Sequence, residues 1–176
     1  MRHLASSLLT VALGATAWMS AAGLSAAEAA PPKPGAHAPD TAQVAPMLDQ
    51  GRYAEAARAY ADLYAKAPSP ELLFNAAFYY GRAGQLDKAT PLARKYTETV
   101  TCHAPAKLQP REIRHCALAA EMLGNLQQAL TLFEDYQKRA EIWAHRSRAE
   151  DDVQRVQLKM KISALETEMA TLKAKK

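Results

Sequence analysis

A six-residue pattern that begins with glycine occurs three times in this chain of 176 residues and limits its fold more than any other feature. The pattern is a Gly, an aromatic residue or Leu two positions later, and an Ala five positions after the Gly; it starts at Gly51, Gly84 and Gly124. Each Gly follows an apolar stretch with helical spacing and opens another one. Gly readily adopts the left-handed conformation that ends a helix, and the small Ala lets two antiparallel helices approach closely. The sequence therefore predicts an all-α fold made of helical hairpins.

The repeated pattern resembles the tetratricopeptide repeat (TPR) family, whose unit is a helix-turn-helix of about 34 residues. The three glycines are 33 and 40 residues apart, and the resemblance covers residues 41–140. Repeat two matches best, at Leu73, Asn75, Ala77, Tyr80, Leu86, Ala89, Ala93 and Tyr96. Repeat one matches at Tyr53, Ala56, Tyr60, Leu63 and Pro68, and repeat three at Ile113, Ala117, Ala120, Ala129, Phe133 and Tyr136. The resemblance implies a short solenoid of about three stacked hairpins.

The chain departs from the family pattern at three places. Pro46 falls within the first helix of repeat one, which we therefore expect to be short or kinked. Pro91 falls early in the second helix of repeat two and is expected to bend that helix or delay its start. The connection around residues 101–109 is longer than the family's usual one, so regular solenoid geometry is not expected there.

By resemblance, the first helices of the repeats line a concave groove that holds a protein or peptide partner. The positions that face this groove are Glu71, Phe74, Asn75, Phe78 and Arg82 in repeat two, and Arg111, Arg114, His115, Leu118 and Met122 in repeat three. In this family the Asn typically holds the backbone of an extended peptide. The arginines would pair with acidic side chains or a terminal carboxylate, and the phenylalanines would give apolar contact. The alternative is that the phenylalanines belong to the core and the arginines to ordinary surface.

The only two cysteines, Cys102 and Cys116, flank the irregular connection. In an oxidising compartment such a pair favours a disulfide bond. A metal site is the alternative, because each cysteine is adjacent to a histidine. Neighbouring residues on a helix point about 100° apart, so His115 and Cys116 cannot readily grip one ion, and the spacing matches no common zinc motif. We expect a disulfide and no metal.

Residues 141–176 contain no Pro and no Gly and consist of good helix formers, which predicts one long helix. Five apolar residues in it alternate at spacings of four and three: Leu158, Ile162, Leu165, Met169 and Leu172. That spacing is the seam of a coiled coil, although it runs little more than two heptads. The alternatives are that the helix caps repeat three, that residues 150–176 form a homodimer, or that the helix contacts another partner or a membrane.

The first forty residues indicate export. Arg2 and His3 precede a long uncharged stretch that ends in the small-x-small pattern Ala27-Glu28-Ala29. This arrangement predicts a signal peptide over residues 1–29, with cleavage after Ala29 or Ala27. Residues 30–40 are rich in Pro and form an expected extended linker. The protein is therefore predicted to be periplasmic or secreted, with no stable membrane insertion after cleavage; an uncleaved N-terminal anchor is the alternative.

The charge and the motif content of the sequence argue against several classes of function. The net charge is +4, and the Lys and Arg residues are spread along the chain with no aromatic residues interleaved, which argues against nucleic-acid binding. The sequence contains no acid-base pair with a nucleophile, no Gly-rich phosphate loop and no metal-ligand cluster, so we expect neither an enzyme nor a cofactor. The leading hypothesis is an exported TPR adaptor or scaffold for protein–protein interaction in the cell envelope. The alternative is an oligomeric structural or envelope-assembly protein that dimerises through its C-terminal helix.

Overall fold

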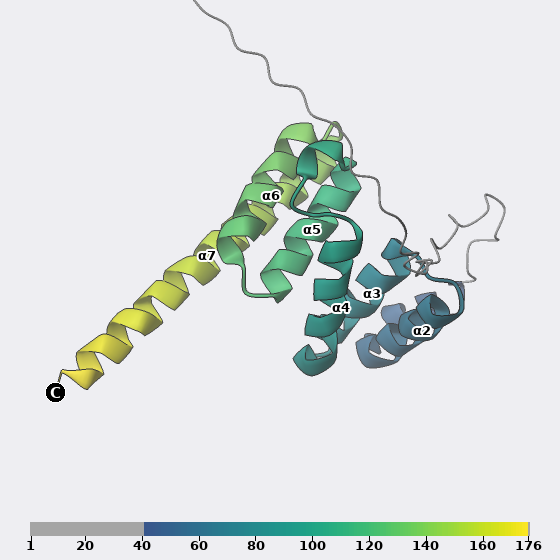
Figure 1. The fold of residues 1–176 in the computed structure, drawn as a ribbon, viewed down its shortest axis with the longest axis horizontal. Helices are drawn as coiled ribbons and strands as arrows, with labels where there is room; N and C mark the ends of the chain where they lie inside the picture. The colour runs from purple at the N-terminus through teal and green to yellow at the C-terminus, as the bar shows by residue number, and fades with distance from the viewer. Residues whose placement is uncertain (1–40, 176) are drawn as a thin grey trace, which may run out of the picture. The chain divides into compact units, whose positions relative to one another are not determined.

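The structure, a computed structural model, describes residues 41–175 (Figure 1). The expected signal peptide and the expected linker, residues 1–40, lie outside the described residues. Within residues 41–175 the protein contains seven α-helices and no strand, so the predicted all-α class is confirmed. The helices are α1 (Ala45–Asp49), α2 (Tyr53–Lys66), α3 (Pro70–Arg82), α4 (Leu86–Thr99), α5 (Pro110–Met122), α6 (Leu126–Arg139) and α7 (Trp143–Ala174). A short 3₁₀ helix, η1 (Pro105–Lys107), lies between α4 and α5.

The helices pack mainly on their neighbours in the chain. Helix α3 packs against both α2 and α4, α5 packs against α4 and α6, and α7 packs against α6. Helices α3 and α5, each of which precedes one of the repeated glycines, also touch one another. Figure 1 shows the successive helices α3, α4, α5 and α6 running side by side. Helices α3 and α5 therefore lie close enough for their side chains to line one continuous surface.

The three repeated glycines end their helices in the same way. Their φ angles are +69° at Gly51, +74° at Gly84 and +77° at Gly124, so the predicted left-handed conformation is confirmed. After each Gly the next backbone N–H donates to a carbonyl five residues earlier, at 2.8, 2.9 and 2.9 Å respectively. This is the hydrogen bond that characterises a Schellman end. A Cβ added at any of the three would meet no atom within 4 Å, so it is the backbone angle, and not crowding, that favours glycine there.

The Ala of each repeated pattern lies at a helix contact. Ala56, Ala89 and Ala129 are all almost completely buried, as close approach of two helices requires. The largest fully buried side chains include Tyr96 and Phe133, which fill the space between helices of the same cluster. Alanines at the contacts and aromatic rings beside them together build the core.

The two prolines that depart from the repeat pattern, Pro46 and Pro91, affect their helices differently. Pro46 lies at the start of α1, which has only five residues, so the predicted short first helix is confirmed. Pro91 lies inside α4, which begins at Leu86, so of the two expected effects, a bend or a delayed start, the delayed start does not occur. The ring is tolerated because Pro91 is exposed on the surface, where the carbonyl left without an N–H donor can be reached by water.

The irregular connection between α4 and α5 is held from two sides. A disulfide bond joins Cys102 to Cys116 of α5, with their Cα atoms 5.6 Å apart, consistent with the predicted pairing. The Arg139 guanidinium of α6 donates hydrogen bonds to the carbonyls of Pro105 and Leu108. The chain leaves α4 through Thr101, whose φ of +59° is the only positive value among the described non-Gly residues. A β-branched residue rarely adopts this angle, so the surrounding bonds hold it there.

Candidate functional site

The candidate site is a cleft of about 530 Å³ bounded by α3, α5 and the first half of α7. Its apolar lining comes from Phe78, Leu86, Leu118 and Met122, with Gly81 between them. Its charged lining comes from Arg82, Arg114, Glu121, Asp152, Arg155 and Lys159. We call the apolar side chains of this lining the floor; a cleft that combines them with charged groups can hold a ligand through both kinds of contact.

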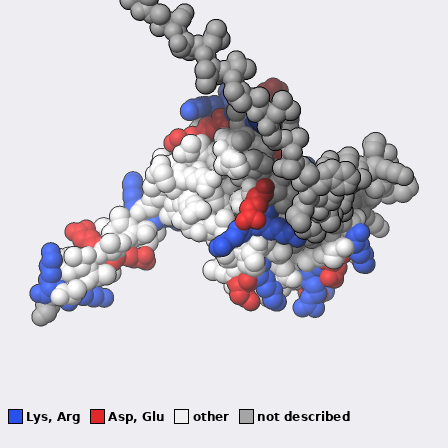
Figure 2. All heavy atoms as spheres, viewed as in Figure 1, with Lys and Arg blue, Asp and Glu red and all other residues white. Residues whose placement is uncertain are grey.

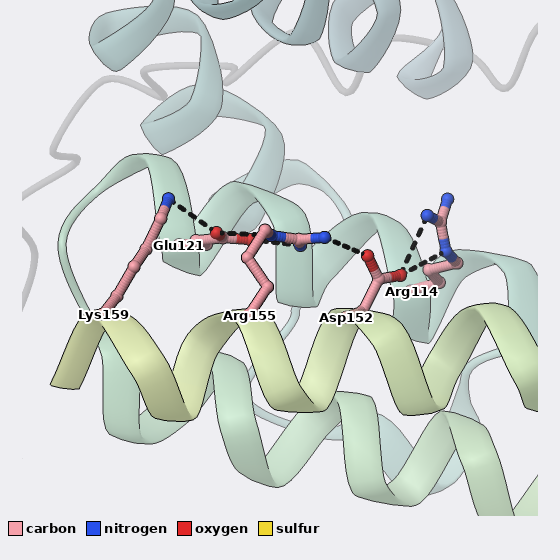
Figure 3. Close-up of polar contacts among 5 residues, drawn as sticks. All are labelled: Arg114, Glu121, Asp152, Arg155 and Lys159. Atoms are coloured by element: carbon pink, nitrogen blue, oxygen red, sulfur yellow. Dashed lines mark hydrogen bonds and ion pairs between the residues drawn. The ribbon is translucent and has the colours of Figure 1, made fainter. Parts of the chain in front are cut away.

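A chain of charged contacts connects α5 to α7 along one wall of the cleft (Figure 3). The Arg114 guanidinium pairs with the Asp152 carboxylate at 2.9 Å, and Asp152 also pairs with Arg155. Arg155 reaches on to Glu121 at 2.7 Å, and the Lys159 ammonium donates to the same carboxylate at 2.8 Å. Both carboxylates are buried, with 5% of the Asp152 side chain and 8% of the Glu121 side chain exposed. Buried acids of this kind require close cationic partners, and each of them has two.

The protonation states support this chain of contacts. Burial alone would raise the pKa of Glu121, but hydrogen bonds from Arg155 and Lys159 outweigh it, and the pKa lies below its ordinary value. The bond to Glu121 is also the main reason that the pKa of Arg155 is raised. Both groups are therefore fully charged near neutral pH. The result is a rigid wall in which the first half of α7 is joined to α5 by ion pairs.

The structure brings together four of the eight residues predicted for the groove. Phe78, Arg82, Arg114 and Leu118 all line the cleft. Met122, which the family resemblance also placed in the groove, lies beside them.

The other four predicted residues lie outside the cleft lining. Glu71 and Arg111 form an ion pair with one another on the exposed surface. Asn75 is half-buried. Phe74 is only 4% exposed and belongs to the core, which is the alternative interpretation that the spacing of the aromatic residues left open. The reason is local: its ring stacks on His115 at 3.8 Å between centroids, and on Phe78.

Four charged residues of the cleft were not among the predicted site residues: Glu121, Asp152, Arg155 and Lys159. The last three lie on one face of α7, at spacings of three and four residues, which is a detectable sequence signal for a charged helix face. The sequence does not say which helix this face meets. That depends on how α7 docks against α5 and α6.

Comparisons with known proteins add no family assignment. No protein-family model matches the chain, and no curated protein matches it either. Within residues 41–175, no helix is long and apolar enough to cross a bilayer. The same residues contain no cluster of three or more His, Cys, Asp or Glu side chains that would hold a metal ion.

His115 of α5 follows the cleft residue Arg114 but is not part of the cleft lining, and it makes the fold sensitive to acid. Its imidazole is stacked between helices on Phe74, and edge-on to Tyr96 at 6.3 Å. Burial lowers the pKa of His115 to about 4, with further contributions from the charges of Arg111 and Arg114. The imidazole is therefore neutral in the folded protein at pH values where it takes up a proton in the unfolded chain.

We expect the protein to lose stability between pH 6.5 and pH 4 because of this histidine. The unfolded chain binds the proton first, so the free energy of unfolding falls as the pH falls through that window. His115 alone contributes a loss of about 3 kcal/mol between pH 7 and pH 4. The His115→Phe variant keeps a ring on Phe74 and should show a correspondingly smaller loss in urea unfolding at the two pH values. The His103→Phe control, at an exposed position, should behave as the wild type; equal losses in all three proteins would contradict the assignment.

Proposed function

We propose that this chain is a non-enzymatic adaptor of the TPR type, which holds a segment of a protein partner in the cleft between α3, α5 and α7. The observation that carries the proposal is the composition of the cleft, whose apolar floor lies beside Arg82, a cation that forms no ion pair within the described residues. A cleft with these properties suits binding better than catalysis, since both of its carboxylates are already paired with cations.

The repeated turns support the TPR part of the proposal. The three glycines share one conformation and one hydrogen-bonding pattern, and a helix of similar length follows each of them. Contacts mainly between helices that are adjacent in the chain are what a stack of hairpins would have. The partner-binding part rests on the cleft and not on the family, because one repeat architecture serves many partners.

The charge of the cleft indicates the class of partner. Four cationic side chains line it against two carboxylates, so its net charge is positive. Arg114, Arg155 and Lys159 are engaged with those carboxylates, whereas Arg82 donates a hydrogen bond to the Tyr53 hydroxyl and lies over the Tyr53 ring. A segment that carries an acidic group and one large apolar side chain would satisfy Arg82 and cover the floor at Phe78 and Leu118.

Export to the periplasm or beyond is the second half of the proposal. The expected signal peptide supports it, and so does the disulfide between Cys102 and Cys116, because such bonds persist in oxidising compartments. An envelope location would also bring the cleft close to other exported proteins.

The test is selection of peptides from a random displayed library on the purified full chain, followed by titration calorimetry of the selected peptides. We expect the selected peptides to combine acidic and large apolar residues. Arg82→Glu should weaken their binding about tenfold or more, the effect of losing one charge-assisted contact and adding a repulsion. Arg58→Glu, the same charge change at an exposed position of α2, should leave binding unchanged. Peptides that bind Arg82→Glu as tightly as the wild type, or no selected peptides at all, would refute the cleft as the site.

A further inference from the structure

The second half of α7 carries an apolar stripe that nothing in the described chain covers. Every residue from 161 to 175 is exposed, and Figure 1 shows this part of the helix extending beyond the other helices. Five of the seven exposed large apolar side chains lie on it, between 46% and 60% exposed: Leu158, Ile162, Leu165, Met169 and Leu172. In Figure 2 the same end of α7 shows uncharged surface between groups of acidic and basic side chains. We call these five residues the seam.

The seam faces away from the protein's own core. In its first half α7 buries Ala149 and Val156, with Val153 and Met160 partly buried beside them. At 100° per residue, this buried stripe and the seam are centred on nearly opposite sides of the helix. The first half of α7 therefore caps the preceding helices, while the seam cannot reach them by any further docking of the same helix. A second molecule can approach the seam without meeting the buried stripe.

We propose that the seam binds the seam of a second copy of this chain, in a parallel two-stranded coiled coil over residues 158–172. The spacing of four and three places Ile162 and Met169 at the a positions of the heptad, and the three leucines at the d positions. Ile at a with Leu at d favours two parallel strands. This inference is independent of the peptide cleft, whose lining includes no residue of the seam.

The flanking charges fit a second copy and select its direction. In a parallel pair each g residue faces the e residue of the next heptad on the other strand. Lys161 then meets Glu166, and Glu168 meets Lys173, all of which are exposed in the single chain. In an antiparallel pair with the same overlap, e faces e and g faces g. Glu166 would then lie beside Glu166, and Lys159 beside Lys173, which disfavours that arrangement although Lys161 would meet Glu168.

Anchoring of α7 compensates for the short length of the seam. An isolated helix of about fifteen residues is marginal in water, because the first turn is costly to form. Here the helix is already nucleated and held by the ion pairs of Asp152 and Glu121 before the seam begins. The seam residues then only extend an existing helix, which lowers the cost of ordering on association. The dimer would carry two clefts, so that a partner with two matching segments binds with avidity.

The test is the mass of the purified full chain by sedimentation equilibrium, at concentrations from about 1 to 100 µM. We expect the wild type to reach twice the monomer mass in this range. The double variant Ile162→Asp/Leu165→Asp should remain monomeric. The control is the double variant Ser163→Asp/Thr167→Asp, which changes two exposed positions off the seam and should dimerise as the wild type does. A monomeric wild type throughout, or a dimer that survives the seam substitutions, overturns the proposal. So does a monomer that instead sediments with vesicles of anionic lipid.

Two further variants test the charge pairs. Lys161→Glu/Lys173→Glu makes all four flanking positions acidic, and Glu166→Lys/Glu168→Lys makes them basic. Each variant alone should be monomeric, and an equimolar mixture should recover the dimer mass. For the direction, Leu172→Cys should form a cross-linked dimer on oxidation, because the two 172 positions are adjacent only in a parallel pair; in the antiparallel pair each would face Leu158. Failure of the mixture to associate, or of the cysteine to cross-link, counts against the parallel coiled coil; neither result depends on whether the cleft binds peptides.

Discussion

Replacing Asp152 by Ala is expected to lower the free energy of unfolding by about 3 kcal/mol, at the lower end of the range for breaking a buried ion pair. The carboxylate is almost fully buried and holds two cations, Arg114 from α5 and Arg155 from α7. Without it, Arg114 remains charged in a largely buried position with no acid opposite. Arg155 is less affected, because it keeps Glu121 and is partly exposed to solvent. Urea unfolding of the variant and the wild type at pH 7 measures the difference.

The neighbouring acid supplies the control for this substitution. Asp151→Ala removes the same charge from the same helix at an exposed position and should change stability by less than about 0.5 kcal/mol. Amide hydrogen exchange should locate the effect: the first half of α7 should exchange faster in Asp152→Ala, while α2 and α3 should change little. A variant as stable as the Asp151 control would show that the network does not hold α7 in place.

Removal of the disulfide bond should lower the free energy of unfolding by a similar amount. The bond joins residues 14 apart in the sequence, and closing a loop of about fifteen residues contributes about 3 kcal/mol in the chain-entropy model. The Cys102→Ala/Cys116→Ala variant should therefore unfold at a lower urea concentration than the wild type. Because both sulfurs are buried, small alanines are preferable to serines, whose hydroxyls would be left without partners.

A reducing agent separates loss of the bond from loss of packing. Unfolding in the presence of dithiothreitol should shift the wild type toward the double variant and leave the double variant where it was. If the wild type unfolds identically with and without the reductant, the bond contributes nothing to stability. The connection between α4 and α5 would then be held by Arg139 and local packing alone.

Local features of the fold could be predicted from residues close together in the chain. The left-handed glycines, the alanines at the helix contacts and the short first helix at Pro46 each depend on a few neighbouring residues, and each was expected before the structure. For α4, Pro91 left two expectations open, a bend or a delayed start, and the start is not delayed. A proline favours a helix start at or just before its own position, but hydrogen bonds within the preceding turn sustain the helix from Leu86.

The candidate site was only half predictable, for a physical reason. The family resemblance placed Phe78, Arg82, Arg114 and Leu118 in a groove, and they do line the cleft. The resemblance could not separate Phe74 from Phe78, since both occupy groove positions and only the stacking on His115 takes Phe74 into the core. Nor could it place α7 along the cleft, because charged residues of α7 meet α5 across a sequence separation of more than thirty residues.

The amino-acid sequence therefore specifies the helices, their turns and the heptad spacing of the last helix, because each of these arises from contacts over a few residues. The direction in which α7 lies, and hence the ion pairs that close the cleft, follows from packing between distant segments. That packing also divides α7 into a half that covers the core and a half whose seam stays free. Both halves are amphipathic, and it is the docking of the first half on α6 that leaves the second exposed.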